Sequence, residues 1–159
     1  MLTPGPTHIS ACNRVSEEVR RATRKANDAA KNSDPICVYE ENNFYRAIAA
    51  LSVYDTLISI PVADGVGRSP LDGPIVNTKD GGMILGENDA ASYLFRKNAS
   101  IVSFTDIAGI SNAMEKAVDE SPEIRSAQAT AIQDIVSSLD PAATIHQIIS
   151  ELHEVSNSR

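Results

Sequence analysis

The residues best suited to holding a ligand gather where an apolar run gives way to a tight turn. The run Ser59–Val62 leads to Asp64, and Gly65 and Gly67 permit the sharp turn that follows. Backbone N–H groups in such a turn, and at the start of a helix after it, present a partial positive charge. This stretch therefore suits a phosphate or pyrophosphate, and the carboxylate beside it can accept hydrogen bonds from sugar hydroxyls.

A second carboxylate follows in the helix that this turn feeds. Ser69 is the expected N-cap, Pro70 fits the first turn, and Asp72 lies three residues after the cap, as in a capping box. Asp64 and Asp72 can both accept hydrogen bonds from ligand hydroxyls. Two glycines and two acids also suit a turn and a helix with a purely structural role, so the spacing alone leaves both interpretations open.

The elements that position these residues follow from the spacing of apolar side chains. Short aliphatic runs predict four parallel strands, near residues 36–39, 56–61, 82–86 and 100–104. Helical spacing predicts the segments between them, over residues 13–32, 44–52, from about 69 onward, and 90–95. This alternation is typical of an α/β fold, in which a parallel sheet is covered on both faces and ligands bind at the carboxyl ends of its strands.

The last third of the chain is predicted to be helical throughout, over residues 107–118, 122–139 and 141–155. Asp106 and Asp140 each precede one of these helices and are the expected N-caps, because their side chains can accept hydrogen bonds from the first free backbone N–H groups. This part of the chain carries most of its acidic excess.

Composition and charge exclude several classes of protein. The chain has 159 residues, a net charge of −7 and no tryptophan, so its core must be aliphatic. A pI of about 4.9 argues against nucleic acid as a partner, and no apolar run approaches the roughly 18 residues of a membrane span. Cys12 and Cys37 form neither a disulfide scaffold nor a zinc pattern, so we expect a cytoplasmic protein without a metal.

The first predicted helix carries a cluster of basic residues. The cluster consists of Arg20, Arg21, Arg24 and Lys25, with Glu17 and Glu18 beside it. This mixture is typical of a solvated helix face with i,i+4 ion pairs. A phosphate-facing patch is the alternative interpretation.

Two runs of the chain resemble the trehalose-6-phosphate synthases, which are retaining glycosyltransferases of family 20 with the GT-B fold. These runs are Tyr54–Gly65 and Asp72–Leu85. The segment Ser103–Asp106 resembles the family's Val-Asn-Pro-Phe/Tyr-Asp signature, and Asn88–Ala91 takes the place of its Ala-Gly-Ala turn. The chain is also similar to the pseudo-glycosyltransferase of the validamycin pathway, which joins cyclitols. The resemblance extends over about residues 1–153.

The resemblance implies a fold and a domain organisation. Residues 1–159 would form a single domain, most of the C-terminal nucleotide-sugar-binding domain of a GT-B enzyme, with a partial Rossmann-like parallel sheet of about four strands. Residues 1–12 would be a lead-in loop and residues 106–159 a helical segment. The acceptor domain and an Arg/Lys clamp for the pyrophosphate precede the matched part of the family. The missing N-terminal domain or a partner chain is therefore an expected partner, and we expect uncovered apolar surface where the lead-in loop enters.

The resemblance also assigns roles at the donor sugar. Asp64 would contact the sugar hydroxyls and is the one residue assigned to the catalytic centre. Three residues would approach the same sugar through their backbone: Gly65, Val66 and Gly67.

The nucleotide would lie on the helix side of the turn. Backbone N–H groups of Arg68 and Ser69 would meet its phosphates, and Asp72, in place of a family glutamate, would bind the ribose. The family has Asn-Leu-Val at the positions of Gly67–Ser69 and lysine at Leu71, so this chain departs from the family pattern there.

The implied function is transfer of a sugar from a UDP- or GDP-sugar to a sugar phosphate or a cyclitol phosphate, without a protein nucleophile, metal or cofactor. In such a transfer the protein contributes positioning and electrostatic stabilisation. Without the clamp and the acceptor domain, the isolated chain is expected to be inactive. The alternatives are a non-catalytic nucleotide-sugar-binding or regulatory module, and a subunit of a split enzyme.

Overall fold

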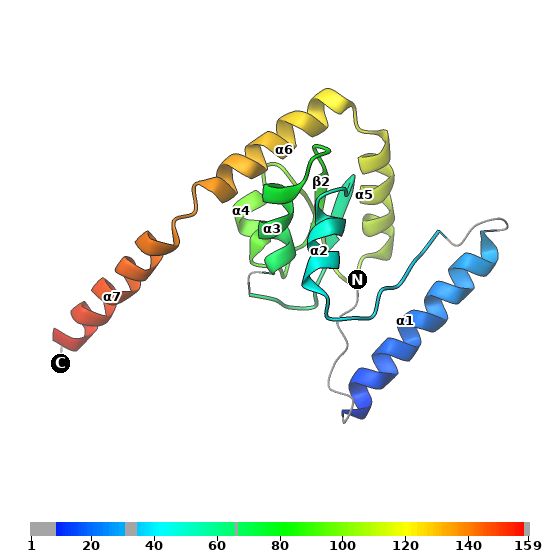
Figure 1. Ribbon diagram of the computed structural model, residues 1–159, viewed down its shortest axis with the longest axis horizontal. Coiled ribbons are helices and arrows are strands. Elements are labelled where there is room, and N and C mark those ends of the chain that lie inside the picture. The colour runs from blue at the N-terminus through cyan, green and yellow to red at the C-terminus, as the bar shows by residue number, and fades with distance from the viewer. Residues whose placement is uncertain (1–8, 31–34, 66, 158–159) are drawn as a thin grey trace. The chain divides into compact units, whose positions relative to one another are not determined.

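The computed structural model describes residues 9–30, 35–65 and 67–157 (Figure 1). The chain divides into two compact units, residues 1–47 and 48–159. Three sequence predictions lie outside the described residues: most of the lead-in loop, the end of the first helix at residues 31–32, and Val66.

The first unit contains helix α1, Ser10–Ala29, which begins three residues before its predicted start. The segment after it, predicted as a strand over residues 36–39, is not a strand, and this prediction was wrong. Its backbone is held by a side chain instead. The Asn27 Nδ2 group donates to the Ile36 carbonyl at 2.9 Å, and the Ile36 N–H donates to Asn27 Oδ1 at 3.0 Å. An amide side chain thus takes the place of a neighbouring strand.

The second unit is built on a parallel sheet of three strands rather than the predicted four. They are β1 (Thr56–Ser59), β2 (Gly82–Gly86) and β3 (Ser100–Val102), in the order β1-β2-β3. Leu57 lies opposite Met83, and Leu85 lies opposite Ile101. All five residues of β2 are buried, as expected for the central strand of a sheet covered on both faces.

Helices cover both faces of the sheet. Helix α2 (Phe44–Leu51) precedes β1, α3 (Arg68–Val76) follows it, and α4 (Ala91–Phe95) follows β2. The C-terminal helices are α5 (Ile107–Asp119), α6 (Pro122–Ser137) and α7 (Pro141–Asn157). Helix α6 packs against α3, α4 and β2, whereas α5 packs against β2 and β3. In Figure 1, α3, α4 and α6 lie on one side of the sheet and α5 lies on the other.

The predicted caps of the C-terminal helices are confirmed. Asp106 Oδ1 accepts a hydrogen bond from the Gly109 N–H at 2.9 Å, and Asp140 Oδ1 accepts one from the Ala142 N–H at 2.9 Å. Each bond satisfies a backbone donor that the first turn of a helix leaves free.

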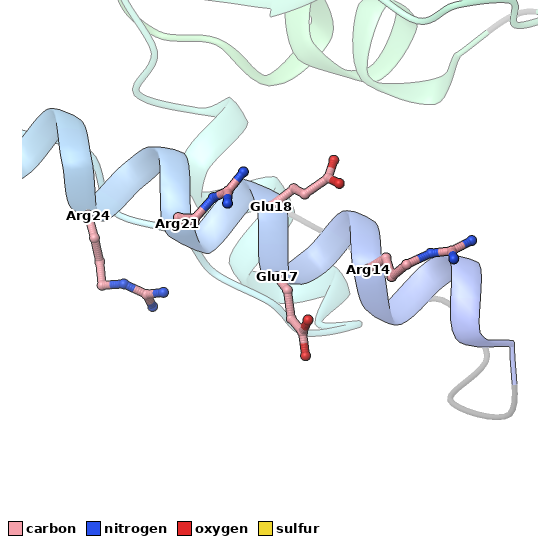
Figure 2. Close-up of a pocket in the computed structure, with 5 residues that line it drawn as sticks. All are labelled: Arg14, Glu17, Glu18, Arg21 and Arg24. Carbon is pink, nitrogen blue, oxygen red and sulfur yellow. The ribbon is translucent and has the colours of Figure 1, made fainter.

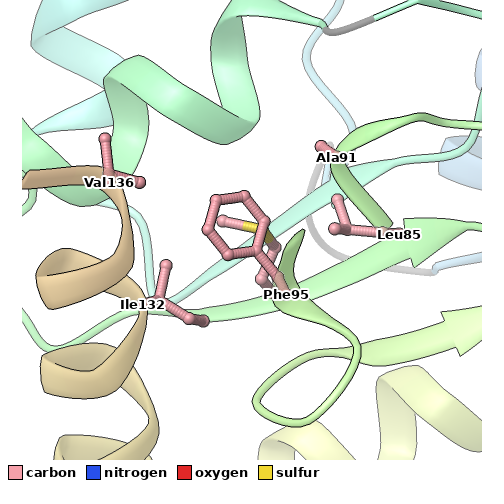
Figure 3. Close-up of a cluster of buried hydrophobic side chains, with 6 residues drawn as sticks. Leu85, Ala91, Phe95, Ile132 and Val136 are labelled. Carbon is pink, nitrogen blue, oxygen red and sulfur yellow. The ribbon is translucent and has the colours of Figure 1, made fainter. Parts of the chain in front are cut away.

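The hydrophobic core lies between β2 and the helices α4 and α6. Figure 3 shows the Phe95 ring between Ile132 and Val136 of α6 on one side and Leu85 and Ala91 on the other. Phe95, Leu85 and Ala91 have no exposed surface, and Ile132 is 1% exposed. This core fixes α4, and with it the end of β2, against the rest of the unit.

Helix α7 keeps an apolar face open to solvent. Ile145, Ile148, Ile149 and Leu152 recur at helical spacing on it, and each is exposed by 46% or more. The uncovered apolar surface expected where the lead-in loop enters stays a prediction, because most of that loop lies outside the described residues. None of the helices that the structure describes has the length and apolar character of a membrane span.

Core packing predicts a sharp contrast between two isoleucines. Ile132→Ala removes buried methyl groups beside Phe95 and should lower the free energy of unfolding by about 2–4 kcal/mol. The matched variant Ile148→Ala, on the exposed face of α7, should change it by less than about 0.5 kcal/mol. Urea unfolding followed by circular dichroism measures both. Equal losses would show that α7 contributes to the core in solution.

Candidate functional site

The turn singled out in the sequence lies at the carboxyl edge of the sheet, as predicted. Strand β1 ends at Ser59, and Asp64 forms a single parallel bridge with Asp89, which follows β2. The loops after two neighbouring strands therefore run side by side. In open parallel sheets this edge is where ligands bind.

Among the described residues, three hydrogen bonds join the first loop, residues 60–65 and 67, to the second loop, residues 87–90. The Asp64 N–H donates to the Asn88 carbonyl at 3.1 Å, and the Ala90 N–H donates to the Gly65 carbonyl at 2.9 Å. The side-chain amide of Asn88 donates to the Val62 carbonyl at 2.8 Å. The second loop thus sets the path of the first, and Asp64, whose side chain is exposed, is carried on that path.

Asp89 has no exposed surface and is the functional candidate that sequence reasoning missed. Its Oδ2 accepts a hydrogen bond from the Ser59 hydroxyl at 2.9 Å, and its Oδ1 accepts one from the Ala91 N–H at 2.9 Å. The second bond caps the start of α4. The signal for this contact in the sequence is an aspartate between a buried strand and a helix start. The family resemblance at residues 88–91 does not indicate it.

Gly67 lies against both carboxylates. A Cβ at this position would stand 3.3 Å from Asp64 Oδ2 and 3.7 Å from Asp89 Oδ2. The backbone of Gly67 has a φ of −60°, which any residue can adopt. Close approach, rather than conformation, is therefore what favours glycine here. The two oxygens face the same small surface of the turn.

The predicted capping box at the start of α3 was wrong. Gly67 takes the N-cap position and makes no side-chain cap bond, while Ser69 lies inside the helix. Asp72 turns toward Arg68, with its Oδ2 at 3.1 Å from Nη2 and 3.2 Å from Nε of that guanidinium. An i,i+4 ion pair is the better contact, because a glycine cap supplies no side chain for a reciprocal bond.

The first two residues of α3 are open to solvent. Arg68 and Ser69 are exposed, and Asp72 keeps 31% of its side chain exposed. Asp64 lies next to Gly67, the N-cap of α3, and Asp72 contacts Arg68, its first residue. The first-turn N–H groups and the helix dipole supply the positive potential there, and Arg68 has its charge offset by Asp72.

Asn77 ties the strand β2 to the segment before β1. Its side-chain amide donates to the Tyr54 carbonyl at 2.9 Å, and its Oδ1 accepts from the N–H groups of Lys79 and Gly81, each at 2.9 Å. A Cβ at Gly81 would stand 2.2 Å from the Tyr54 ring, so only glycine fits beneath it. This part of the motif that resembles the synthases is therefore structural, since it aligns the strands that carry the two loops.

The basic face of α1 does not form a convergent site. Figure 2 shows five side chains around a shallow hollow on this helix, pointing in different directions: Arg14, Glu17, Glu18, Arg21 and Arg24. Arg20 pairs with Glu40, and hydrogen bonds from Arg20 and Ser16 hold the pKa of the Glu40 carboxyl below its ordinary value. These contacts favour the solvated-face interpretation.

No three His, Cys, Asp or Glu side chains among the described residues are grouped to hold a metal ion. The candidate site therefore consists of backbone donors and carboxylates. Such a set binds hydroxyl groups and phosphate oxygens.

These features define an α/β protein with the GT-B type of parallel sheet. No protein-family model matches the chain. Its fold is that of a part of the trehalose-6-phosphate synthases: the enzyme of Burkholderia multivorans superposes with a TM-score of 0.85 at 16% identity, covering 98% of this chain and 35% of that one. The UDP-forming α,α-trehalose-phosphate synthase of Burkholderia xenovorans, in complex with glucose-6-phosphate, has a TM-score of 0.85 at 16% identity, covering 95% and 34%.

In sequence, the chain is similar to validamine 7-phosphate valienyltransferase of Streptomyces hygroscopicus subsp. jinggangensis. The two are 26% identical over 133 residues, which cover 84% of this chain and 27% of the relative. The resemblance found in the sequence is thus confirmed for both groups, and the chain has a glycosyltransferase-like fold. The chain spans about a third of the synthase structures and about a quarter of the transferase.

Burial of Tyr54 predicts a stability loss at alkaline pH. Burial raises the pKa of Tyr54 to about 12 from an ordinary value of 10. Its stabilising contribution is complete below the unfolded-state pKa and is lost as the pH rises from about 10 through 12. Tyr54→Phe should therefore unfold with a flatter pH dependence over this interval than the parent chain.

The matched control is Tyr45→Phe, since Tyr45 is 85% exposed. Its free energy of unfolding, measured by urea titration between pH 9 and 12, should follow that of the parent chain. Identical pH slopes for Tyr54→Phe and Tyr45→Phe would contradict the assignment.

Proposed function

We propose that this chain is the nucleotide-sugar-binding part of a retaining glycosyltransferase resembling trehalose-6-phosphate synthase. The reaction would transfer a sugar from a UDP- or GDP-sugar to a sugar phosphate or a cyclitol phosphate. The observation that carries this proposal is the Asp64–Ser69 turn, which lies at the carboxyl edge of a parallel sheet and opens onto the exposed start of α3. The fold shared with the synthases supports it.

The proposed site has two parts, one that binds the sugar and one that binds the phosphates. Asp64 accepts hydrogen bonds from sugar hydroxyls, and the backbone of Gly65 and Gly67 lets the ring approach closely. Val66 has the same assigned role and lies outside the described residues. Carboxylate oxygens at this sugar end can accept hydrogen bonds from the hydroxyl groups of the ring.

The phosphate end lies on α3. The N–H groups of Arg68 and Ser69 face the diphosphate, and Asp72, with an oxygen beyond its contact to Arg68, accepts a hydrogen bond from the ribose. In the reaction, the bond from the anomeric carbon to the diphosphate oxygen breaks, and a bond to the acceptor oxygen or nitrogen forms. The departing diphosphate takes the acceptor's proton. The acceptor domain and the cationic clamp would come from the rest of the enzyme or from a partner chain.

A non-catalytic binding or regulatory module is the second candidate. The observation that favours it is the ion pair between Arg68, the first residue of α3, and Asp72, because it engages one oxygen of the carboxylate assigned to the ribose. A subunit of a split enzyme would retain the same ligand. Either one would bind a nucleotide-sugar without transferring the sugar by itself.

Two isosteric variants test the assigned roles. Asp64→Asn should weaken UDP-glucose binding about tenfold and leave UDP unchanged, because Asp64 contacts only the sugar; about tenfold corresponds to one charged hydrogen bond. Asp72→Asn should weaken both ligands, because the ribose is common to them. Isothermal titration calorimetry with UDP, UDP-glucose and GDP-glucose measures these affinities.

Asp119→Asn, at the far end of α5, is the control and should bind like the parent chain. The assigned roles are wrong if both site variants weaken bare UDP to the same extent. Absence of binding by the parent chain at millimolar ligand would overturn the proposed function and leave the fold alone.

A further inference from the structure

We propose that Asp89 is a positioning residue of the sugar subsite. From beneath Gly67, its buried carboxylate holds the Asp64–Gly67 turn in the shape that a hydroxyl-rich ring requires. This inference rests on the proposed function, because it assigns a new residue to the same site. It is argued from the surroundings of Asp89, a residue to which the family resemblance assigns no role.

A fully buried carboxylate is costly unless its charge is compensated. Asp89 has no exposed surface, and among the described residues no Lys, Arg or His forms an ion pair with it. The groups that donate hydrogen bonds to its carboxylate, the Ser59 hydroxyl and the Ala91 N–H, are neutral. Because a neutral residue would avoid the desolvation cost, the carboxylate must supply something that an apolar packing residue cannot.

What it supplies is a bond between the ends of two strands. Ser59 is the last residue of β1, and Asp89 follows β2, so the Ser59–Asp89 hydrogen bond closes the gap where the sheet pairing stops. The backbone bonds from Asp64 to Asn88 and from Ala90 to Gly65 lie directly beyond it. Loss of the Ser59–Asp89 bond would therefore loosen the two loops where Asp64 projects.

Asp89 also shapes the electrostatics of the subsite. Its Oδ2 and that of Asp64 both lie within 4 Å of the point where a Gly67 Cβ would stand. Two negative groups around one glycine attract hydrogen-bond donors and repel anions. The space next to Gly67 therefore favours the hydroxyl groups of a neutral ring. The phosphates are directed toward the start of α3.

Ser59 offers the cleanest test, because it touches Asp89 and lies beneath the turn. Ser59→Ala removes the hydroxyl, and Ser59→Thr keeps it in a residue suited to a strand. In calorimetry on the full chain, Ser59→Ala and Asp89→Asn should each weaken UDP-glucose binding about tenfold. Bare UDP should bind within twofold of the parent, and Ser59→Thr should restore UDP-glucose affinity.

A merely structural role would give a different pattern. Equal losses for UDP and UDP-glucose, unchanged affinity in Ser59→Ala, or failure of Ser59→Thr to restore binding would each overturn the positioning role. The comparison of the two ligands separates a local change at the sugar end from partial unfolding.

Amide hydrogen exchange keeps the inference testable if the parent chain binds neither ligand and the proposed function fails. In Ser59→Ala and Asp89→Asn, exchange at the Asp64 and Ala90 N–H groups should accelerate about tenfold, the loss of roughly one hydrogen bond. Exchange at Ile132, in the core, should be unchanged. Unaltered exchange at Asp64 and Ala90 would overturn the inference independently of any ligand.

Discussion

Strand β2 is buried along its whole length, and both of the other strands of the sheet hydrogen-bond to it. Parallel pairing with β2 brings the end of β1 beside its own end, and this is why Asp64 and Asp89, far apart in sequence, face the same glycine. The Phe95 core presses α4 and α6 onto this strand, while Asn77 ties its start to Tyr54. The geometry of the site is therefore determined mainly by the apolar packing of β2, α4 and α6. The polar residues of the two loops are held in place by that packing.

Much of this arrangement could be predicted from local patterns. The three observed strands are short aliphatic runs with breaks on either side, and α5 and α7 each begin after an aspartate whose side chain caps the first turn. Residues 36–39 have the same aliphatic character and are not a strand, because a strand depends on a neighbour and Asn27 satisfies this backbone instead. The periodicity of apolar residues does not indicate which distant segment a strand will pair with.

In the candidate site, too, local sequence signals predict some features, and contacts between distant residues determine the others. The turn at Asp64–Gly67 is visible in the sequence because glycines and a strand end are local signals. The predicted capping role of Ser69 was wrong because α3 begins two residues earlier, with Gly67 as its N-cap, and because Asp72 pairs with Arg68. Asp89 was missed because its role arises from Ser59, thirty residues away, and from burial that only the packed sheet creates.

The crowding at Gly67 has a consequence for how this sequence can change. The first carbon of any side chain there would stand 3.3 Å from Asp64 Oδ2, so that carboxylate would have to shift by a few tenths of an ångström. The asparagine that the resembling family carries at this position would therefore displace the exposed Asp64 carboxylate, while its first carbon would meet Asp89 Oδ2 at an ordinary contact distance of 3.7 Å. Substitutions at 67 and 89 act on shared neighbours and are not additive. The order in which the two positions mutate decides which intermediates keep an intact site.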